Sequence, residues 1–276
     1  MKIGYMYNRV MHRVCLRMFP KAETICEEPL TDEPSVFVCN HANIIGPVMM
    51  TLHFKRRHKS WIVHTALDKT KTANFAFHDI FFGDSRRFKV FWRILSRMVK
   101  HLLPTLLKYE DSIPVYHDSK IASTFKQSVK ALSDGEDLVI FAESTERYTE
   151  YINRLQPGFV DVARLYYRRT GKRLSFYPTY IEKQNAVISI GKPIVYDPDI
   201  PIDEQREVIT DFLADSIDRL ARKLPEHTPA PFLPQRWYDA YGERFEHDVM
   251  GYWKMIEEVE DSPADKKQQK EDVESK

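Results

Sequence analysis

The chain has 276 residues, a length that fits one large domain with appendages, and its formal net charge is +1. A charge so close to zero gives no general attraction to nucleic acid, so no nucleic-acid partner is expected. The three cysteines, Cys15, Cys26 and Cys39, are too few and odd in number for a disulfide scaffold. No N-terminal stretch resembles a signal peptide, and no run of about 18 apolar residues could span a membrane. We therefore predict a cytoplasmic protein, with peripheral association with a membrane left open.

The first predicted elements alternate between helix and strand. Apolar residues recur at helical spacing over residues 3–19, and a continuous apolar strand follows over residues 35–39. Within that strand Cys39 is either a small buried hydrophobe or, less simply, a reactive thiol. Pro47 suits the first turn of a helix that runs to about residue 53.

A basic run over residues 55–59 comes next, followed by a strand predicted over residues 61–65. The run either contacts phosphate groups or is a solvated loop. His53, His58 and His64 are not at metal-ligand spacings, and no Cys-x2-Cys pair is present, so no metal site is expected.

Residues 86–108 predict a basic amphipathic helix, which Pro104 kinks or ends. Its apolar stripe consists of Phe88, Phe91, Leu95, Met98, Leu102 and Leu106. Seven lysines and arginines supply the rest, with no acidic residue between Asp84 and Glu110. Such a helix either packs on the core with a solvated basic face, or lies on a membrane or an acidic protein.

The remaining periodicities continue the alternation. They predict strands over 113–116, 137–142, 175–181 and 186–190, and helices over 121–133, 159–169 and 204–224. A loop is expected between residue 147 and Gly158. We therefore predict an α/β fold with a mostly parallel central sheet flanked by helices.

The predicted domain covers residues 1–227 and includes the N-terminal helix. Three prolines within residues 228–234 predict a linker. Aromatic residues then recur at helical spacing over residues 235–260, which predicts an added C-terminal helix that docks on the domain or binds a partner or membrane. The charged tail, residues 261–276, is predicted to be disordered.

Three predicted strands end in polar side chains. They are followed by Asn40-His41, by Tyr116-His117 and by the run Glu143-Ser-Thr-Glu-Arg147. Strand ends of a parallel sheet gather on one edge, so these groups are expected to converge. His41, at a strand-to-helix junction, is placed to act as a general base.

These segments resemble the sequence blocks of the glycerolipid acyltransferases, which comprise the glycerol-3-phosphate and lysophosphatidic acid acyltransferases. Asn40-His41 resembles the first block, N-H-x4-D, and Ile113-Pro-Val-Tyr-His117 resembles the second, I-x-V-x-R. Phe141-Ala-Glu-Ser-Thr-Glu146 resembles the third, F-P-E-G-T-R. Later matches are Leu155-Gln-Pro-Gly158, Tyr177-Pro-Thr179 and Ile190-Gly-Lys-Pro-Ile194, and order and spacing agree over residues 35–225.

Several positions depart from the family pattern. Gly46 stands in place of the aspartate, His117 and Glu146 in place of the two arginines, Ser144 in place of the glycine and Ala142 in place of the proline. In the family, the histidine takes a proton from the acceptor hydroxyl as its oxygen attacks a thioester carbonyl, and the aspartate holds the imidazole. Asn43 or Glu143 could substitute for that aspartate.

The family's two arginines bind the phosphate of the acceptor, for which bidentate geometry suits arginine. Histidine is only partly charged near neutral pH, and a glutamate repels phosphate. Arg147 could reach the phosphate only if its loop shifted register. The preferred acceptor is therefore expected to be non-phosphorylated or cationic.

The resemblance implies an acyltransferase that moves a fatty acyl group from coenzyme A or an acyl carrier protein to an alcohol or amine. The implied catalytic residues are His41 and Glu143. The implied substrate-binding residues are Asn43, His117, Ser144, Thr145 and Arg147. No cofactor is expected, a membrane surface is an open further partner, and the oligomeric state is not predicted. The alternative is a catalytically degenerate homologue that binds lipid or a partner protein.

Overall fold

The computed structural model describes residues 21–42, 45–67, 73, 76–77, 87–98, 112–116, 119–230 and 232. The predicted helices over 3–19 and 235–260 and the charged tail over 261–276 lie outside the described residues. So do Asn43 and His117.

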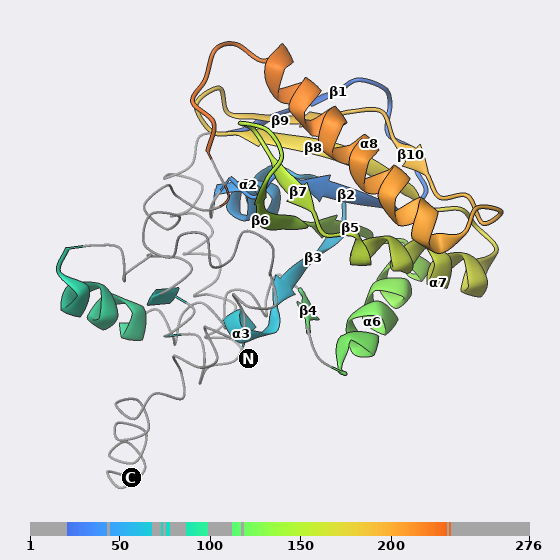
Figure 1. The fold of residues 1–276 in the computed structure, drawn as a ribbon, viewed down its shortest axis with the longest axis horizontal. Helices are drawn as coiled ribbons and strands as arrows, with labels where there is room; N and C mark the ends of the chain where they lie inside the picture. Colours follow the sequence, from blue (N-terminus) through green and yellow to red (C-terminus); the bar gives the residue numbers. More distant parts are fainter. Residues whose placement is uncertain are drawn as a thin grey trace, which may run out of the picture.

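A mixed, mostly parallel sheet forms the centre of the fold (Figure 1). Its strand order is β1-β9-β8-β2-β5-β3-β4, and β10 pairs with β8. The strands are β1 (Glu23–Cys26), β2 (Ser35–Cys39), β3 (His58–Val63), β4 (Ile113–Val115), β5 (Asp137–Ile140), β8 (Ser175–Glu182), β9 (Val187–Ile190) and β10 (Ile194–Val195). Strands β8, β2, β5, β3 and β4 are mutually parallel, so their carboxyl ends share one edge.

Helices cover the sheet. They are α2 (Ile45–His53), α3 (His64–Leu67), α6 (Ile121–Ser133), α7 (Asp161–Thr170), which the short 3-10 helix η3 (Pro157–Val160) precedes, and α8 (Ile202–Lys223). Residues 89–98 are also helical. Helix α8 crosses the sheet over β8 (Figure 1). The predicted α/β class is therefore confirmed, and no helix of the described ranges is long and apolar enough to cross a membrane.

Strand β2 shows why a continuous apolar run was the right signal for a central strand. Val36 and Val38 belong to the core that includes side chains of α6, α7 and α8. Phe37 and Cys39 belong to a second core on the other face, where α2 contributes Met49 and Met50. Because both faces are covered, every residue of β2 is buried. Cys39 accordingly lies in the core, where burial raises the pKa of its thiol far above the usual range.

Two sequence predictions need correction. The second strand runs over β3 rather than residues 61–65, because Lys59 and Arg57 pair with Glu136 and draw the basic run against the start of β5. The expected loop before Gly158 instead holds a hairpin, formed by β6 (Glu143–Arg147) and β7 (Asn153–Leu155). Its polar sequence lacks the apolar alternation that signals a strand.

Candidate active site

The candidate site lies where the parallel strands end. Asn40 follows β2 directly and is buried. Its side-chain amide donates to the carbonyl oxygen of Ile181 at 3.2 Å, and its amide oxygen accepts from the Ile181 N–H at 2.7 Å. The Asn40 side chain thus pairs with β8 as a backbone would. It fixes the point at which β2 releases His41.

Glu143 ties this strand end to the β6–β7 hairpin. One carboxylate oxygen accepts the backbone N–H of His41, and the other accepts the backbone N–H of Asn153 at 2.9 Å. Glu143 is only 5% exposed, and its burial raises the pKa to about 7, against the opposing effect of the two N–H donors. The strand ends were expected to converge at this edge, and the structure brings the Glu143 carboxylate to the backbone N–H of His41.

Two aromatic rings flank the imidazole of His41. The ring of Phe141, which follows β5, lies 5.3 Å from it between centroids, and the ring of Phe232 lies at 4.8 Å. Phe232 belongs to the proline-rich segment after α8 and was not predicted as a site residue. The one sequence feature that could have indicated Phe232 is its large apolar side chain, which is unusual in a proline-rich linker.

Gly46 is packed too closely to carry a side chain. Its N–H donates to the His41 carbonyl oxygen at 3.2 Å. A Cβ atom built on it would lie 2.5 Å from that oxygen and 2.8 Å from the Asn40 carbonyl oxygen. Both neighbours are backbone atoms that cannot swing aside. Glycine at this position therefore reflects a close approach of α2 to the end of β2, and this backbone has no room for the family's aspartate.

The residues after Glu143 are held within the hairpin. The Ser144 hydroxyl accepts the Glu146 N–H at 3.2 Å, and the Ser144 carbonyl accepts from the Asn153 side chain at 2.8 Å. Ser144 and Thr145 are buried, whereas Arg147 at the other end of β6 is exposed. Ser144 and Thr145 therefore lie close to the strand edge, and Arg147 lies further from it along β6.

Glu146 is not an isolated negative charge, as its sequence position suggested. Its carboxylate pairs with the Arg154 guanidinium at 3.1 Å across the hairpin. That guanidinium also lies 5.6 Å from the centre of the Tyr148 ring. The repulsion that Glu146 exerts on a phosphate is correspondingly reduced, although the pair leaves no arginine at the position of the family's third-block arginine.

His64 is a second histidine on the same edge. It follows β3 directly, and its ring stacks on Tyr116, which follows β4, with centroids 5.0 Å apart. Its Nδ1 is buried and makes no hydrogen bond to the described part of the chain. Sequence reasoning considered His64 only as a metal ligand. The missed signal is the pattern Trp61-Ile-Val-His64, an apolar strand that ends in histidine like the one before His41.

No three metal-ligating side chains cluster together among the residues placed in the structure. The basic run of residues 55–59 is engaged at the opposite end of the sheet, where Arg56 pairs with Asp137 and Arg57 with Glu136. These ion pairs account for the charge of those two arginines within the fold.

No protein-family model and no curated protein matches this sequence. Among solved structures, the chain is similar to the 1-acyl-sn-glycerophosphate (LPA) acyltransferase PlsC from Thermotoga maritima. The similarity covers 82% of this chain and 81% of that one, with 10% sequence identity and a TM-score of 0.45. A likeness at this level carries no argument about activity, which therefore has to rest on the residues at the strand edge.

Proposed function

We propose that the protein transfers an acyl group from a thioester to an alcohol or amine, with His41 as the general base. The observation that carries the proposal is the joining of two sequence blocks at one edge of the sheet. His41 and Glu143 are 102 residues apart in the chain, and the Glu143 carboxylate accepts the His41 N–H. The resemblance to the glycerolipid acyltransferases implies that both residues are catalytic, and this contact supports the proposal.

The reaction balances with these groups alone. An imidazole nitrogen of His41 takes the proton of the acceptor O–H or N–H as that atom attacks the thioester carbonyl carbon. The tetrahedral intermediate then collapses as its carbon–sulfur bond breaks. The imidazolium returns the proton to the leaving thiolate, so the products are an ester or amide and a free thiol. Glu143 is a positioning residue in this scheme, because it holds the backbone that carries His41.

The close packing at Gly46 limits how fast such a site can run. In serine proteases, spoiling the carboxylate that orients the histidine lowers kcat by ~10⁴. Here no side chain fits at residue 46, and the rings of Phe141 and Phe232 lie against the imidazole. We therefore expect turnover below that of an enzyme in which an aspartate at this position holds the histidine.

The acceptor in this proposal lacks a phosphate. The third-block position that carries arginine in the family holds Glu146, whose charge is balanced by Arg154. Such a pair can accept and donate hydrogen bonds but offers a phosphate no net positive charge. The donor is an acyl thioester on coenzyme A or an acyl carrier protein.

The test measures thiol release from a mixed pool of acyl thioesters, with an alcohol, an amine or lysophosphatidic acid as acceptor. We expect release above background with the first two acceptors, and none above background for His41→Ala. His58→Ala is the matched control because His58 begins β3, at the opposite edge of the sheet. Equal rates for the wild type and His41→Ala would contradict the proposal. Efficient acylation of lysophosphatidic acid would overturn the acceptor class alone.

A second candidate function is binding of an acyl ligand without turnover, which the absence of room for a side chain at Gly46 favours. In that case the protein binds a non-cleavable acyl thioester analogue, and thioester cleavage stays at background for every variant. Binding that persists in His41→Ala together with no turnover in the wild type would select this function.

A further inference from the structure

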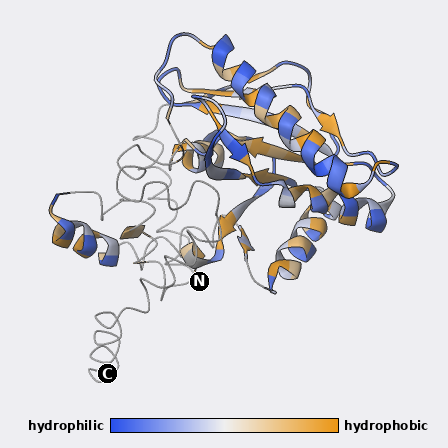
Figure 2. Ribbon diagram, viewed as in Figure 1, coloured by the Kyte–Doolittle hydropathy of each residue, from blue (hydrophilic) through white to orange (hydrophobic). Residues whose placement is uncertain are grey.

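The helix over residues 89–98 exposes a row of apolar side chains, although its other apolar residues Trp92 and Leu95 are partly buried. Val90 is 74% exposed, Ile94 53% and Met98 69%, whereas Ser96 is 1% exposed. A helix of a water-soluble domain ordinarily buries its apolar stripe. In Figure 2 this helix, at the left of the view, carries hydrophobic and hydrophilic residues along its visible surface.

Three cations form a row beside the exposed apolar row. Lys89, Arg93 and Arg97 are spaced four residues apart, so they follow one another along one helix face. Val90, Ile94 and Met98 follow the same spacing one position later. The apolar and basic rows therefore run side by side along the helix.

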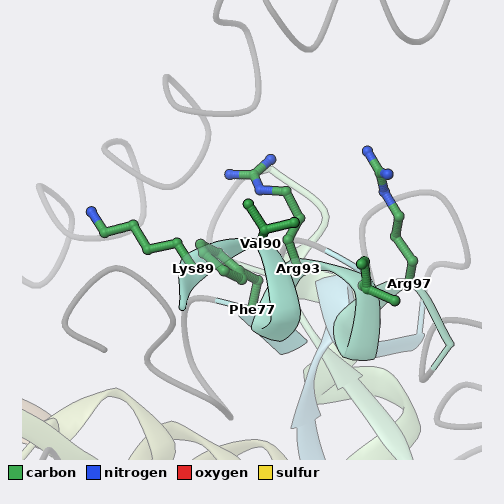
Figure 3. A pocket seen from close by; sticks show the side chains of 6 residues that line it. Phe77, Lys89, Val90, Arg93 and Arg97 are labelled. Atoms are coloured by element: carbon green, nitrogen blue, oxygen red, sulfur yellow. The ribbon is translucent and has the colours of Figure 1, made fainter. Parts of the chain in front are cut away.

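Figure 3 shows the three basic side chains extending away from the helix next to Val90. Together with Phe77, Val90 and Ile94 they line a hollow of about 270 Å³. The Arg93 guanidinium lies 4.7 Å from the centre of the Phe77 ring, which fixes the middle of the row. The hollow thus combines an apolar lining with positive charge at its rim.

The charge of the surrounding sequence narrows the choice of partner. No acidic residue occurs between Asp84 and Glu110, although the whole chain has a net charge of only +1. A partner for this face must present negative charge immediately beside apolar material along the length of a helix. The interface of an anionic bilayer does so, because lipid phosphates lie directly over acyl chains.

We propose that the helix over residues 89–98 docks the protein on an anionic lipid surface. Val90, Ile94 and Met98 enter the acyl region, and Lys89, Arg93 and Arg97 lie at the level of the phosphates. Docking requires neither His41 nor turnover, so the experiment below tests it independently of acyl transfer.

The experiment is vesicle flotation with the full chain. Vesicles of phosphatidylcholine with phosphatidylglycerol are compared with vesicles of phosphatidylcholine alone, at low and high salt. We expect binding to the anionic vesicles that weakens as salt rises. Lys89→Gln with Arg97→Gln should lower it about tenfold to thirtyfold, since each basic residue contributes to attraction at such a surface. Arg93 is kept because it stacks on Phe77.

Matched controls separate the helix from the rest of the surface. Arg168→Gln with Arg169→Gln removes the same charge from α7, where both residues are exposed, and should leave binding unchanged. Val90→Glu with Ile94→Glu should abolish binding, whereas Val208→Glu, at an exposed position of α8, should not. The side chains changed in these variants are all exposed, and far-UV circular dichroism verifies that each variant is folded.

Three outcomes would overturn the proposal. They are failure of the wild type to float with anionic vesicles, equal losses for the two charge variants, and binding to an acidic acyl carrier protein without vesicle binding. The last would assign the face to a protein partner instead.

Discussion

The two edges of the parallel sheet each hold a buried carboxylate, but the partners of the two carboxylates differ. At the amino edge Asp137 accepts the Ser35 N–H at 2.9 Å and pairs with the Arg56 guanidinium. At the carboxyl edge Glu143 accepts the N–H groups of His41 and Asn153. Glu143 forms no ion pair with any residue that the structure describes.

The difference separates a structural carboxylate from a candidate functional one. A buried charge with a cationic partner is balanced within the fold. Glu143 has only backbone dipoles to oppose its desolvation, and its pKa rises to about 7. A group that titrates near neutral pH at the carboxyl edge of a parallel sheet is the combination expected at a site. The comparison therefore identifies Asp137 as a structural carboxylate and makes Glu143, at the carboxyl edge, the candidate for the proposed function.

The largest expected effect concerns the amino edge. Asp137→Ala leaves the partly buried Arg56 without its partner and the Ser35 N–H without an acceptor. We expect a loss of about 3 kcal/mol in the free energy of unfolding, measured by urea denaturation. Glu136→Ala, the neighbouring control, breaks the pairs with the exposed Arg57 and with Lys59 and should cost no more than about 1 kcal/mol. Similar costs for the two variants would remove the distinction between structural and peripheral ion pairs at this edge.

Ionisation of Glu143 at the carboxyl edge should make the free energy of unfolding depend on pH. The pKa of Glu143 rises from 4.5 to about 7 on folding, so between these values the native state binds more protons than the unfolded state. The free energy of unfolding therefore falls as pH rises from 4.5 to 7, by about 3 kcal/mol from this group.

Glu143→Gln cannot ionise, so the stability of the wild type relative to this variant should fall over the same pH range. The measurement is urea denaturation of both proteins at several pH values. Glu146→Gln, three strand positions further along and half exposed, should give a curve parallel to that of the wild type. If the Glu143→Gln curve is also parallel, the carboxylate is ionised throughout and the contrast between the edges disappears.

The elements that sequence predicted best are those whose own residues determine burial. Strand β2 was bounded correctly because its apolar run packs on both faces of the sheet. Gly171 caps α7 at the end of the helix expected over residues 159–169, and its φ of 71° is the left-handed conformation that glycine adopts readily. The hairpin β6–β7 was missed because hydrogen bonds of polar side chains, such as those that join Asn153 to Glu143 and Ser144, hold it together and leave no apolar periodicity.

The site was predictable only in part. The sequence blocks indicated His41 and Glu143 as candidate residues at neighbouring strand ends, but left open whether Glu143 or Asn43 lies beside His41. Contacts of Phe232 with His41 depend on how the chain returns after α8, and no local pattern records that path. The close packing at Gly46 is likewise set by the approach of α2 to β2. From sequence alone the residue could be recognised only as a missing aspartate.

Gly46 gives the smallest expected effect and the most direct test of the carboxyl edge. In Gly46→Ala the new methyl group meets the carbonyl oxygens of His41 and Asn40, so α2 and the end of β2 must separate. Overpacking of this kind costs about 1–3 kcal/mol, measurable by urea denaturation. Gly158→Ala is the control, because a Cβ there meets no atom within 4 Å.

Movement of the His41 backbone in Gly46→Ala should also weaken the hydrogen bond from the His41 N–H to Glu143. The pH dependence of the stability of Gly46→Ala should therefore lie closer to that of Glu143→Gln. If Gly46→Ala instead matches Gly158→Ala in both stability and pH dependence, the backbone around residue 46 can accommodate a side chain. Gly46→Asp then becomes a substitution to assay for acyl transfer.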